Sequence, residues 1–361
     1  MARAIGLITA NYFTKADPAF TLGRPLASLP VLGRYRMIDF ALSNMANCCI
    51  RNVGVILPVN YRSIADHLGA GKEWSLDRKN GGLFLLPGSA FGTARRTGRF
   101  LIKDLLDNKA YLERSRTPYV VVSSASFVYN MSYTELVDAH EASGADITMV
   151  TAKASADYND LCAVQVEDGL VKGFAENVKL GDRAFMDLFV IGREYLLELL
   201  DTYKEVEHLD LFVALASDLK ETKVAEYQYD GYSAVVLDGD QYFATNMALL
   251  DPNVQDKLFP ADRPIITKAH DTPPAKYASG CHVANAMISS GDRIHGSVHG
   301  AVLGRNVIVE EGASIVNSIV LQGTTIRKGA HVENAIVDRN LEISAGQELR
   351  GTTDDILIKQ R

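Results

Sequence analysis

Apolar residues recur at every sixth position near the C-terminus, and this spacing restricts the fold more than any other feature of the chain. Each is followed four places later by a small or apolar residue, and a one-residue reset interrupts the series. A period of six fits neither a helix face nor an alternating strand, but it is typical of a β-helix. We therefore predict a parallel β-helix over residues 281–361. The recurring residues are Leu303, Val309, Ile315, Leu321, Ile326 and Val332, and their followers are Val307, Ala313, Ile319, Thr325, Ala330 and Ile336.

The alternative for this region is an ordinary sandwich of short strands, which does not account for so sustained a spacing. In a β-helix each coil covers the next, and the two ends of the stack stay open. We therefore expect this part of the chain to support assembly, either with itself or with another subunit.

Residues 1–250 alternate between short apolar runs and helical patterns. The continuous apolar run 4–10 is typical of a buried parallel strand. We expect Asp39 to cap a helix that precedes a strand at 52–57, and a capping box at Ser132 and Glu135 to start a helix that Gly144 ends. Such alternation predicts a mostly parallel sheet with helices on both faces. The expected buried stripe of the first helix is Ala41, Met45, Cys48 and Cys49, and further strands are expected at 118–122 and 146–151.

Residues 251–280 contain five prolines and no long apolar period, so we interpret them as a linker. A chain of 361 residues is long enough for two domains. The predicted organisation is an α/β domain at 1–250, the linker at 251–280 and the β-helix at 281–361.

The composition narrows the classes of partner. Hydrophobic residues make up 47% and charged residues 22% of a chain whose net charge is −7, which argues against nucleic-acid binding because binders of phosphate backbones are usually basic. The four cysteines form no C-x-x-C pair, and no apolar run is long enough to span a membrane. We expect a cytoplasmic protein with reduced thiols and small-molecule or protein partners.

Several motifs carry a family resemblance. Residues 35–44 read Tyr-Arg-Met-Ile-Asp-Phe-Ala-Leu-Ser-Asn, and further matches lie at 92–94, 129–133, 231–232 and 242–250. From residue 24 onward this pattern resembles bacterial glucose-1-phosphate adenylyltransferases (ADP-glucose pyrophosphorylases). The resemblance implies a Rossmann-like nucleotidyltransferase domain with a mixed, mostly parallel sheet, a left-handed β-helix, and tetrameric assembly. The family makes ADP-glucose and pyrophosphate from ATP and glucose 1-phosphate for glycogen synthesis.

The chain departs from the family pattern where the reaction needs its ligands. The two magnesium carboxylates of active members correspond to Ser126 and Val235, and neither side chain can replace a carboxylate. The cations that serve the substrates correspond to Leu26 and Asn177. The glycine-rich phosphate loop corresponds to residues 9–13, which contain no glycine. The resemblance therefore implies no catalytic residue and no metal site in this chain.

This set of losses resembles the D-type glycogen-biosynthesis subunit that some bacteria use beside a catalytic subunit. The resemblance implies a regulatory chain that is silent alone and joins a catalytic glucose-1-phosphate adenylyltransferase in a hetero-tetramer. Magnesium is then expected only in the catalytic partner, and no cofactor is expected in this chain.

Arginines are the candidates for binding a phosphorylated effector. Arg24 and Arg36 match family positions that bind such effectors between the domains, and guanidinium groups suit phosphate geometry. Pairing with local carboxylates is an equal alternative for both. Arg62 lies in a related segment, where a solvated side chain is the simpler expectation. A second basic group, Arg95, Arg96, Arg99 and Lys103, is expected to be a solvated face.

Two other functions remain open. The first is a weakly active sugar-1-phosphate nucleotidyltransferase, in which Asp238 or Asp240 would have to supply the lost carboxylate. The second is a hexapeptide-repeat acyltransferase or a structural β-helix protein, for which the β-helix histidines would matter. His67 and His140 have no evident carboxylate partner by spacing, so structural roles are expected. The β-helix histidines are His295, His299 and His331.

Overall fold

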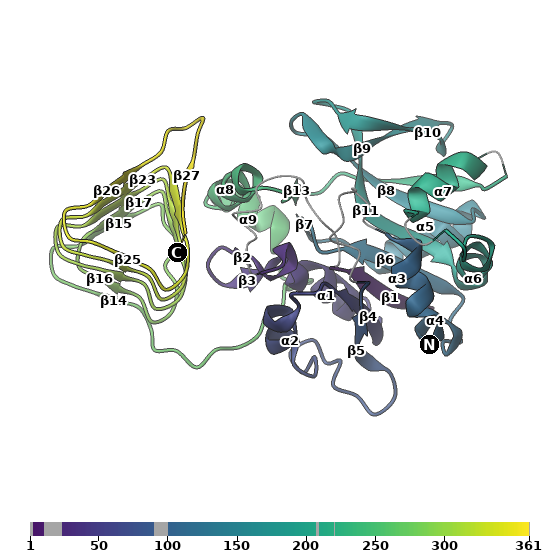
Figure 1. Cartoon of the computed structure of the whole chain (residues 1–361), viewed down its shortest axis with the longest axis horizontal. Coiled ribbons are helices and arrows are strands. Elements are labelled where there is room, and N and C mark those ends of the chain that lie inside the picture. The colour runs from purple at the N-terminus through teal and green to yellow at the C-terminus, as the bar shows by residue number, and fades with distance from the viewer. Residues whose placement is uncertain (1–2, 11–23, 90–99, 207–208, 220, 361) are drawn as a thin grey trace.

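The computed structural model describes residues 3–10, 24–89, 100–206, 209–219 and 221–360, which form an α/β part and a coiled β part (Figure 1). The α/β part contains a sheet of nine strands in the order β5-β4-β1-β6-β11-β8-β12-β10-β9. β11 and β10 run antiparallel to their neighbours, whereas β5, β4, β1 and β6 are parallel to one another. The predicted mixed, mostly parallel sheet is confirmed. In sheet order the strands are Gly82–Pro87, Asn52–Leu57, Ala4–Thr9, Tyr119–Ser124, Arg183–Gly192, Ile147–Lys153, Val224–Tyr229, Leu170–Val178 and Tyr158–Glu167.

Helices cover both faces of this sheet because its strands bury apolar side chains alternately on either side. In β1, Ala4 and Ile8 join one apolar cluster, and Ile5 and Leu7 join another. Helices α1, α2 and α5 pack on the first cluster, and α3, α4, α6 and α7 pack on the second. Their bounds are Met37–Asn47, Arg62–Leu68 and Tyr133–Ser143, then Ile102–Asp107, Lys109–Glu113, Arg193–Thr202 and Leu211–Asp218.

The helix predictions hold for α5 and partly fail for α1. Ser132 Oγ accepts a hydrogen bond from the backbone N–H of Glu135 at 3.3 Å, and α5 ends at Gly144 in the left-handed region. In α1 the N-cap residue is Arg36, not Asp39. The Asp39 carboxylate lies in the first turn instead and accepts the Arg36 backbone N–H at 2.8 Å.

The buried stripe predicted for α1 is also too long. The helix ends at Asn47, Cys48 lies at its C-cap, and Cys49 is exposed with a φ of 58°. The chain turns out of the helix at the two cysteines in order to enter β4. Cys48 still packs, half-buried, against the apolar cluster of Ala41 and Met45, whereas Cys49 is exposed.

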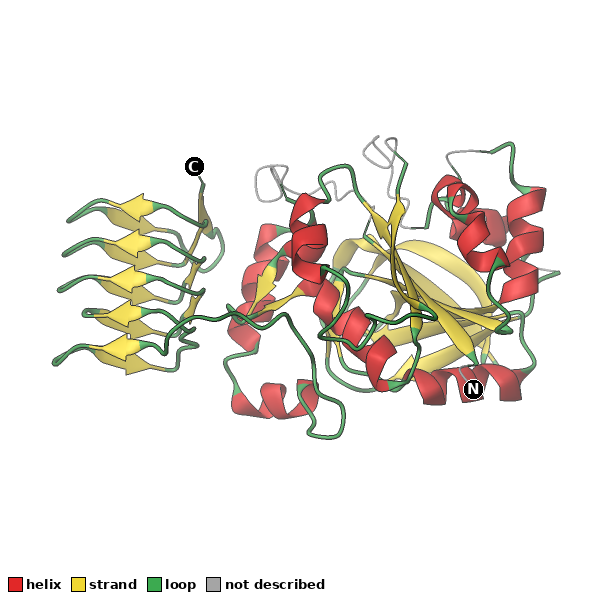
Figure 2. Cartoon of the chain, turned by 90° about the horizontal axis from the view of Figure 1, so that it is seen from below, coloured by secondary structure: helices red, strands yellow, loops and turns green. Residues whose placement is uncertain are grey.

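The second part is a left-handed parallel β-helix of stacked coils, as predicted (Figure 2). Three sheets run along it, one strand per coil. The first comprises β14 (Lys276–Tyr277), β16 (Arg293–Ile294), β19 (Ile308–Val309), β22 (Thr325–Ile326) and β25 (Glu342–Ile343). The second comprises β15 (His282–Ala284), β17 (Ser297–His299), β20 (Ser314–Val316), β23 (His331–Glu333) and β26 (Glu348–Arg350). The third comprises β18 (Val302–Leu303), β21 (Ile319–Val320), β24 (Ala335–Val337) and β27 (Leu357–Lys359).

The coil length corrects one residue of the predicted repeat. Ile326 pairs in register with Ile343, so one coil spans 17 residues (343 − 326). Val309 pairs with Ile326 in the same way, so the coil that contains Leu321 is one residue short of three periods of six. Val320 fills the β-helix interior, whereas Leu321, which we predicted to point inward, packs against the α/β part.

The segment predicted as a linker contains two regular elements. Helix α9 (Pro252–Leu258) follows α8 (Gly239–Ala248), and Leu258 is fully buried among apolar residues of the α/β part. At the other end β14 already forms part of the first coil. The irregular chain between them crosses from one part to the other.

The two parts meet across an apolar face of the β-helix. Val302, Ile319, Leu321 and Ile336 lie in one buried cluster with residues of α1, α8 and α9 (Figure 1). Residues 24–36 of the α/β part also contribute apolar side chains to this cluster. They form η1 (Leu26–Ser28), β2 (Pro30–Val31) and β3 (Tyr35–Arg36). No helix among the described residues is both long and apolar enough to cross a membrane.

Gly33 marks the closest approach of the two parts. Its φ is 63°, and a Cβ there would lie 2.3 Å from the carbonyl oxygen of Leu303. Only glycine fits, because any larger residue would push the β-helix away from the turn between β2 and β3.

We therefore expect Gly33→Ala to lower the melting temperature more than Gly169→Ala. Gly169 also has a positive φ, 74°, but a Cβ there would meet nothing within 4 Å. The control variant should thus cost only the backbone strain, about 1–2 kcal/mol. Circular dichroism melting of both variants measures the difference, and equal losses would contradict a tight contact at Gly33.

Candidate functional site

Ser126 and Val235, the positions expected to have lost the metal carboxylates, lie side by side in the fold. Strands β7 (Phe127–Tyr129) and β13 (Ser233–Val235) pair antiparallel, with Val235 opposite Phe127. The backbone N–H of Val236 donates to the carbonyl oxygen of Ser126 at 2.8 Å. Two segments more than a hundred residues apart in sequence are therefore joined at this point.

Neither side chain offers what a magnesium ion binds. Ser126 is fully buried, its Oγ lies 2.7 Å from Ser124 Oγ, and it donates to the Asp187 carboxylate at 3.4 Å. Val235 is buried in the apolar cluster beneath α1. Magnesium requires several oxygen ligands, usually including carboxylates. The donors at this place do not fit the ion.

Asp187 is a buried carboxylate at this place that the sequence reasoning assigned no role. It is 1% exposed and has a φ of 51°, a conformation that Asp tolerates better than most residues. Among the residues that the structure describes, no group of three or more His, Cys, Asp or Glu side chains could hold a metal ion.

Leu26 and Asn177, the positions expected to have lost cations, have uncharged side chains. Leu26 is buried in η1 within the apolar cluster between the two parts. Asn177 is exposed at a bulge of β10 with a φ of 67°. Of the segment 9–13 the structure describes Thr9 and Ala10, which are buried at the end of β1, and the rest lies outside the described residues, as do Arg95, Arg96, Arg99 and the 92–94 turn.

Asp238, one of the two carboxylates that a weakly active enzyme would need as a metal ligand, has a structural role in this fold. Its Oδ1 caps α8 by accepting the backbone N–H of Gln241 at 2.7 Å. Burial, together with the neighbouring carboxylates of Asp240 and Asp160, raises the pKa of Asp238.

Four arginines gather where the two parts of the chain meet, and we call Arg24, Arg36, Arg305 and Arg339 the guanidinium cluster. Burial and the other three arginines lower the pKa of Arg36, and only Asp39 opposes them. Burial and Arg34, which lies outside the guanidinium cluster, lower the pKa of Arg305, and Asp39 opposes them. Cations held this close, partly out of water, are conditions under which a bound anion is favoured.

Two carboxylates partly offset this charge. Arg24, whose side chain is 8% exposed, donates to Asp338 of the β-helix at 2.9 Å. Arg36 donates to the carbonyl oxygen of Ser63 at 2.7 Å and lies beside Asp39. Four guanidinium groups thus face two carboxylates. The sequence motifs predicted Arg24 and Arg36 as phosphate-binding candidates but not Arg305 and Arg339, which the β-helix contributes.

Arg62 stands apart from the guanidinium cluster. Its side chain is 94% exposed, and its nearest carboxylate is Asp66, one helical turn away at 3.9 Å. The expectation of a solvated side chain agrees with this exposure.

Asp39 connects the cluster to a buried histidine. His67 Nε2 lies 2.6 Å from Asp39 Oδ1, and both side chains are buried. The sequence reasoning saw no carboxylate partner for His67 because 28 residues separate the two. His140, by contrast, pairs with Thr148 Oγ1 at 2.8 Å, and burial lowers its pKa.

The comparisons with known proteins agree with this architecture. Residues 20–214 match the nucleotidyl transferase family, and residues 273–354 match the GlmU-like C-terminal hexapeptide family. The glycogen biosynthesis protein GlgD of Bacillus subtilis is 30% identical over 99% of this chain and 95% of its own length. The chain belongs to the nucleotidyl transferase family, among the GlgD glycogen biosynthesis proteins. Its role therefore falls within glycogen synthesis.

Other relatives extend the likeness to enzymes. GlgD of Geobacillus stearothermophilus is 31% identical over 87% of this chain and 83% of its own length. The glucose-1-phosphate adenylyltransferase of Fervidobacterium nodosum is 28% identical over 96% of this chain and 85% of its own length. The replaced side chains at Ser126 and Val235 therefore lie within a fold shared with proteins named as enzymes.

The Arg24–Asp338 pair should couple the two parts of the chain energetically. We expect Asp338→Asn to cost more stability than Arg24→Met, since it leaves a buried guanidinium unpaired, on the order of 3 kcal/mol. The double variant should lose less than the sum, with a coupling of about 0.5–3 kcal/mol. Chemical denaturation of the four proteins measures this cycle. Strict additivity would show that the pair does not hold the parts together.

Proposed function

We propose that this chain is a regulatory, catalytically silent subunit of a glucose-1-phosphate adenylyltransferase that supports ADP-glucose formation in the cytoplasm. The carrying observation is the adjacency of Ser126 and Val235, where side chains without charge occupy both positions expected to hold magnesium carboxylates. The nucleotidyl transferase family nevertheless matches residues 20–214. The chain keeps the family's fold, but the side chains around Ser126 and Val235 do not fit magnesium. This combination supports a role in subunit assembly instead of catalysis.

The partner in this proposal is a catalytic adenylyltransferase subunit, joined in a hetero-tetramer. Support comes from the β-helix, whose stacked coils leave open ends, and from a relative named as the enzyme that matches 96% of this chain and 85% of its own length. Magnesium would then be bound only by the catalytic partner. Self-association of this chain uses the same open ends and is an outcome that a size measurement separates.

A weakly active nucleotidyltransferase is the second candidate, and Asp187 is the observation that favours it. Its buried carboxylate lies beside Ser126, close to the place of one lost ligand. One carboxylate flanked by serine hydroxyls still falls short of the ligand set for magnesium.

The purified chain should make no ADP-glucose from ATP and glucose 1-phosphate in the presence of magnesium. The reason is the missing charge compensation between two anionic phosphates. Coupled detection of pyrophosphate release measures turnover, with a catalytic adenylyltransferase as the positive control. Robust turnover by the chain alone would sink the silent-subunit proposal and favour the second candidate.

Co-expression of this chain with the host's catalytic subunit, followed by measurement of the particle size and the catalytic rate, completes this test. A single larger species and a changed rate or a changed response to metabolites are expected. Two separate species with an unaltered catalytic rate would contradict the regulatory role even if the chain proves inactive.

We further propose that the guanidinium cluster binds a phosphorylated metabolite. Its four cations exceed its two nearby carboxylates, and a phosphate accepts several guanidinium hydrogen bonds at once. Asp338 then competes with the incoming phosphate, because it already occupies Arg24.

Titration with inorganic phosphate and with glucose 1-phosphate should distinguish three variants. Arg36→Ala should weaken binding about tenfold, the equivalent of losing one charge-assisted hydrogen bond. Asp338→Asn should tighten it, since the competing carboxylate is gone. Arg62→Ala, whose side chain is 94% exposed outside the cluster, serves as the matched control and should change nothing. Equal affinities in all three would exclude the cluster as an anion site.

A further inference from the structure

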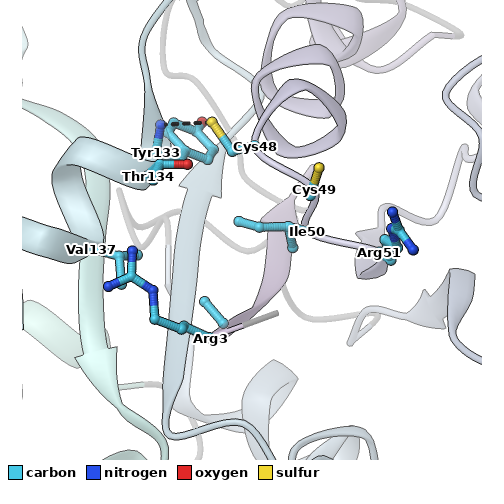
Figure 3. A pocket seen from close by; sticks show the side chains of 9 residues that line it. Arg3, Cys48, Cys49, Ile50, Arg51, Tyr133, Thr134 and Val137 are labelled. Carbon is cyan, nitrogen blue, oxygen red and sulfur yellow. Dashed lines mark hydrogen bonds between the residues drawn. The ribbon is translucent and has the colours of Figure 1, made fainter. Parts of the chain in front are cut away.

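A pocket on the α/β part contains two thiols and two arginines and plays no part in the functions discussed above. It has a volume of about 360 Å³ and lies where β1 begins, α1 ends and α5 begins (Figure 3). Its lining includes Arg3, Cys48, Cys49, Arg51, Tyr133 and Thr134. Small-molecule sites in proteins start at about this size.

Cys48 is held in the pocket by the first turn of α5. Its Sγ accepts a hydrogen bond from the backbone N–H of Tyr133 at 3.0 Å, and Tyr133 is the first residue of that 11-residue helix (Figure 3). Backbone N–H groups at a helix N-terminus favour negative charge, and a thiolate accepts such a bond better than a thiol. The first turn of α5 therefore directs a backbone N–H at the Cys48 sulfur beside the pocket.

The charges around the pocket favour an anionic reagent. The Arg3 guanidinium is already paired with Asp138 and Glu141. Arg51 is exposed, and its side chain has no ion pair among the described residues. The two arginines lie on opposite sides of the pocket (Figure 3). A molecule that carries carboxylates would find one uncompensated cation at the rim.

Cys49 is a poor partner for an internal disulfide with Cys48. The Cα atoms of consecutive residues are about 3.8 Å apart across a trans peptide, which is shorter than ordinary disulfides allow. In Figure 3 the two sulfur atoms also point in different directions. A group attached to Cys48 would therefore persist until an external thiol removes it.

We infer that this pocket is a thiol-modification site in which Cys48 exchanges with a small, carboxylate-bearing disulfide. The Cys48 thiolate attacks one sulfur of the disulfide, a new sulfur–sulfur bond forms, and the old one breaks. The departing thiolate carries away the electron pair, and the Cys48 proton goes to solvent. Because the adduct displaces the Tyr133 hydrogen bond, modification also loosens the contact between α1 and α5.

Oxidised glutathione is the probe for this inference, with bis(2-hydroxyethyl) disulfide as the neutral comparison. The full chain is reacted near neutral pH and each cysteine is quantified by peptide mass spectrometry. Cys48 should react at least about fivefold faster than the more exposed Cys49, as expected of a thiol activated by a helix N-terminus. Modification in order of exposure, with Cys49 first, would overturn the proposal.

Two variants test the charge and the residue. Arg51→Gln should slow the reaction of Cys48 with oxidised glutathione about fivefold and leave the neutral disulfide unaffected. Cys48→Ser keeps an acceptor for the Tyr133 N–H and should abolish the adduct without unfolding the chain. An Arg51→Gln variant that slows both reagents equally, or neither, would contradict an anion-selective pocket. Since no catalytic activity is measured, the outcome is independent of the regulatory proposal.

Discussion

The apolar contact between the β-helix and the α/β part determines how the rest of the molecule is arranged. Val302, Ile319, Leu321 and Ile336 point out of the coils instead of into them, and each is at most 2% exposed. Burying four such side chains contributes on the order of several kcal/mol. This apolar contact therefore fixes the position of the β-helix on the α/β part. It also determines which polar groups of the two parts lie next to one another.

That constraint explains the guanidinium cluster. Arg24 and Arg36 come from the first segment of the α/β part, and Arg305 and Arg339 come from turns of the β-helix. The other three arginines lower the pKa of Arg36 and Asp39 opposes them, while Asp338 pairs with Arg24. In the proposed anion site, a bound phosphate would relieve part of the repulsion between these cations.

The sequence was most informative where a period repeats and least informative where distant segments meet. The six-residue spacing predicts the β-helix, since inward-facing apolar residues recur in successive coils. It misplaces Leu321 because the coil that contains it has 17 residues, one short of three full periods. The strands and the α5 caps follow from local patterns. The His67–Asp39 pair, the β-helix arginines and Asp187 depend on tertiary contacts, which no local spacing encodes.

The uncharged side chains at Ser126 and Val235 are compatible with the proposed silent subunit on physical grounds. Two carboxylates at the positions of Ser126 and Val235 would be buried side by side, where like charges repel and desolvation is costly. A cation normally makes such an arrangement stable. The serine hydroxyl instead bonds to Ser124 and Asp187, and valine adds to the apolar cluster. Under the silent-subunit proposal, the β7–β13 pair needs no cation to fold, and the domain would serve assembly instead of catalysis.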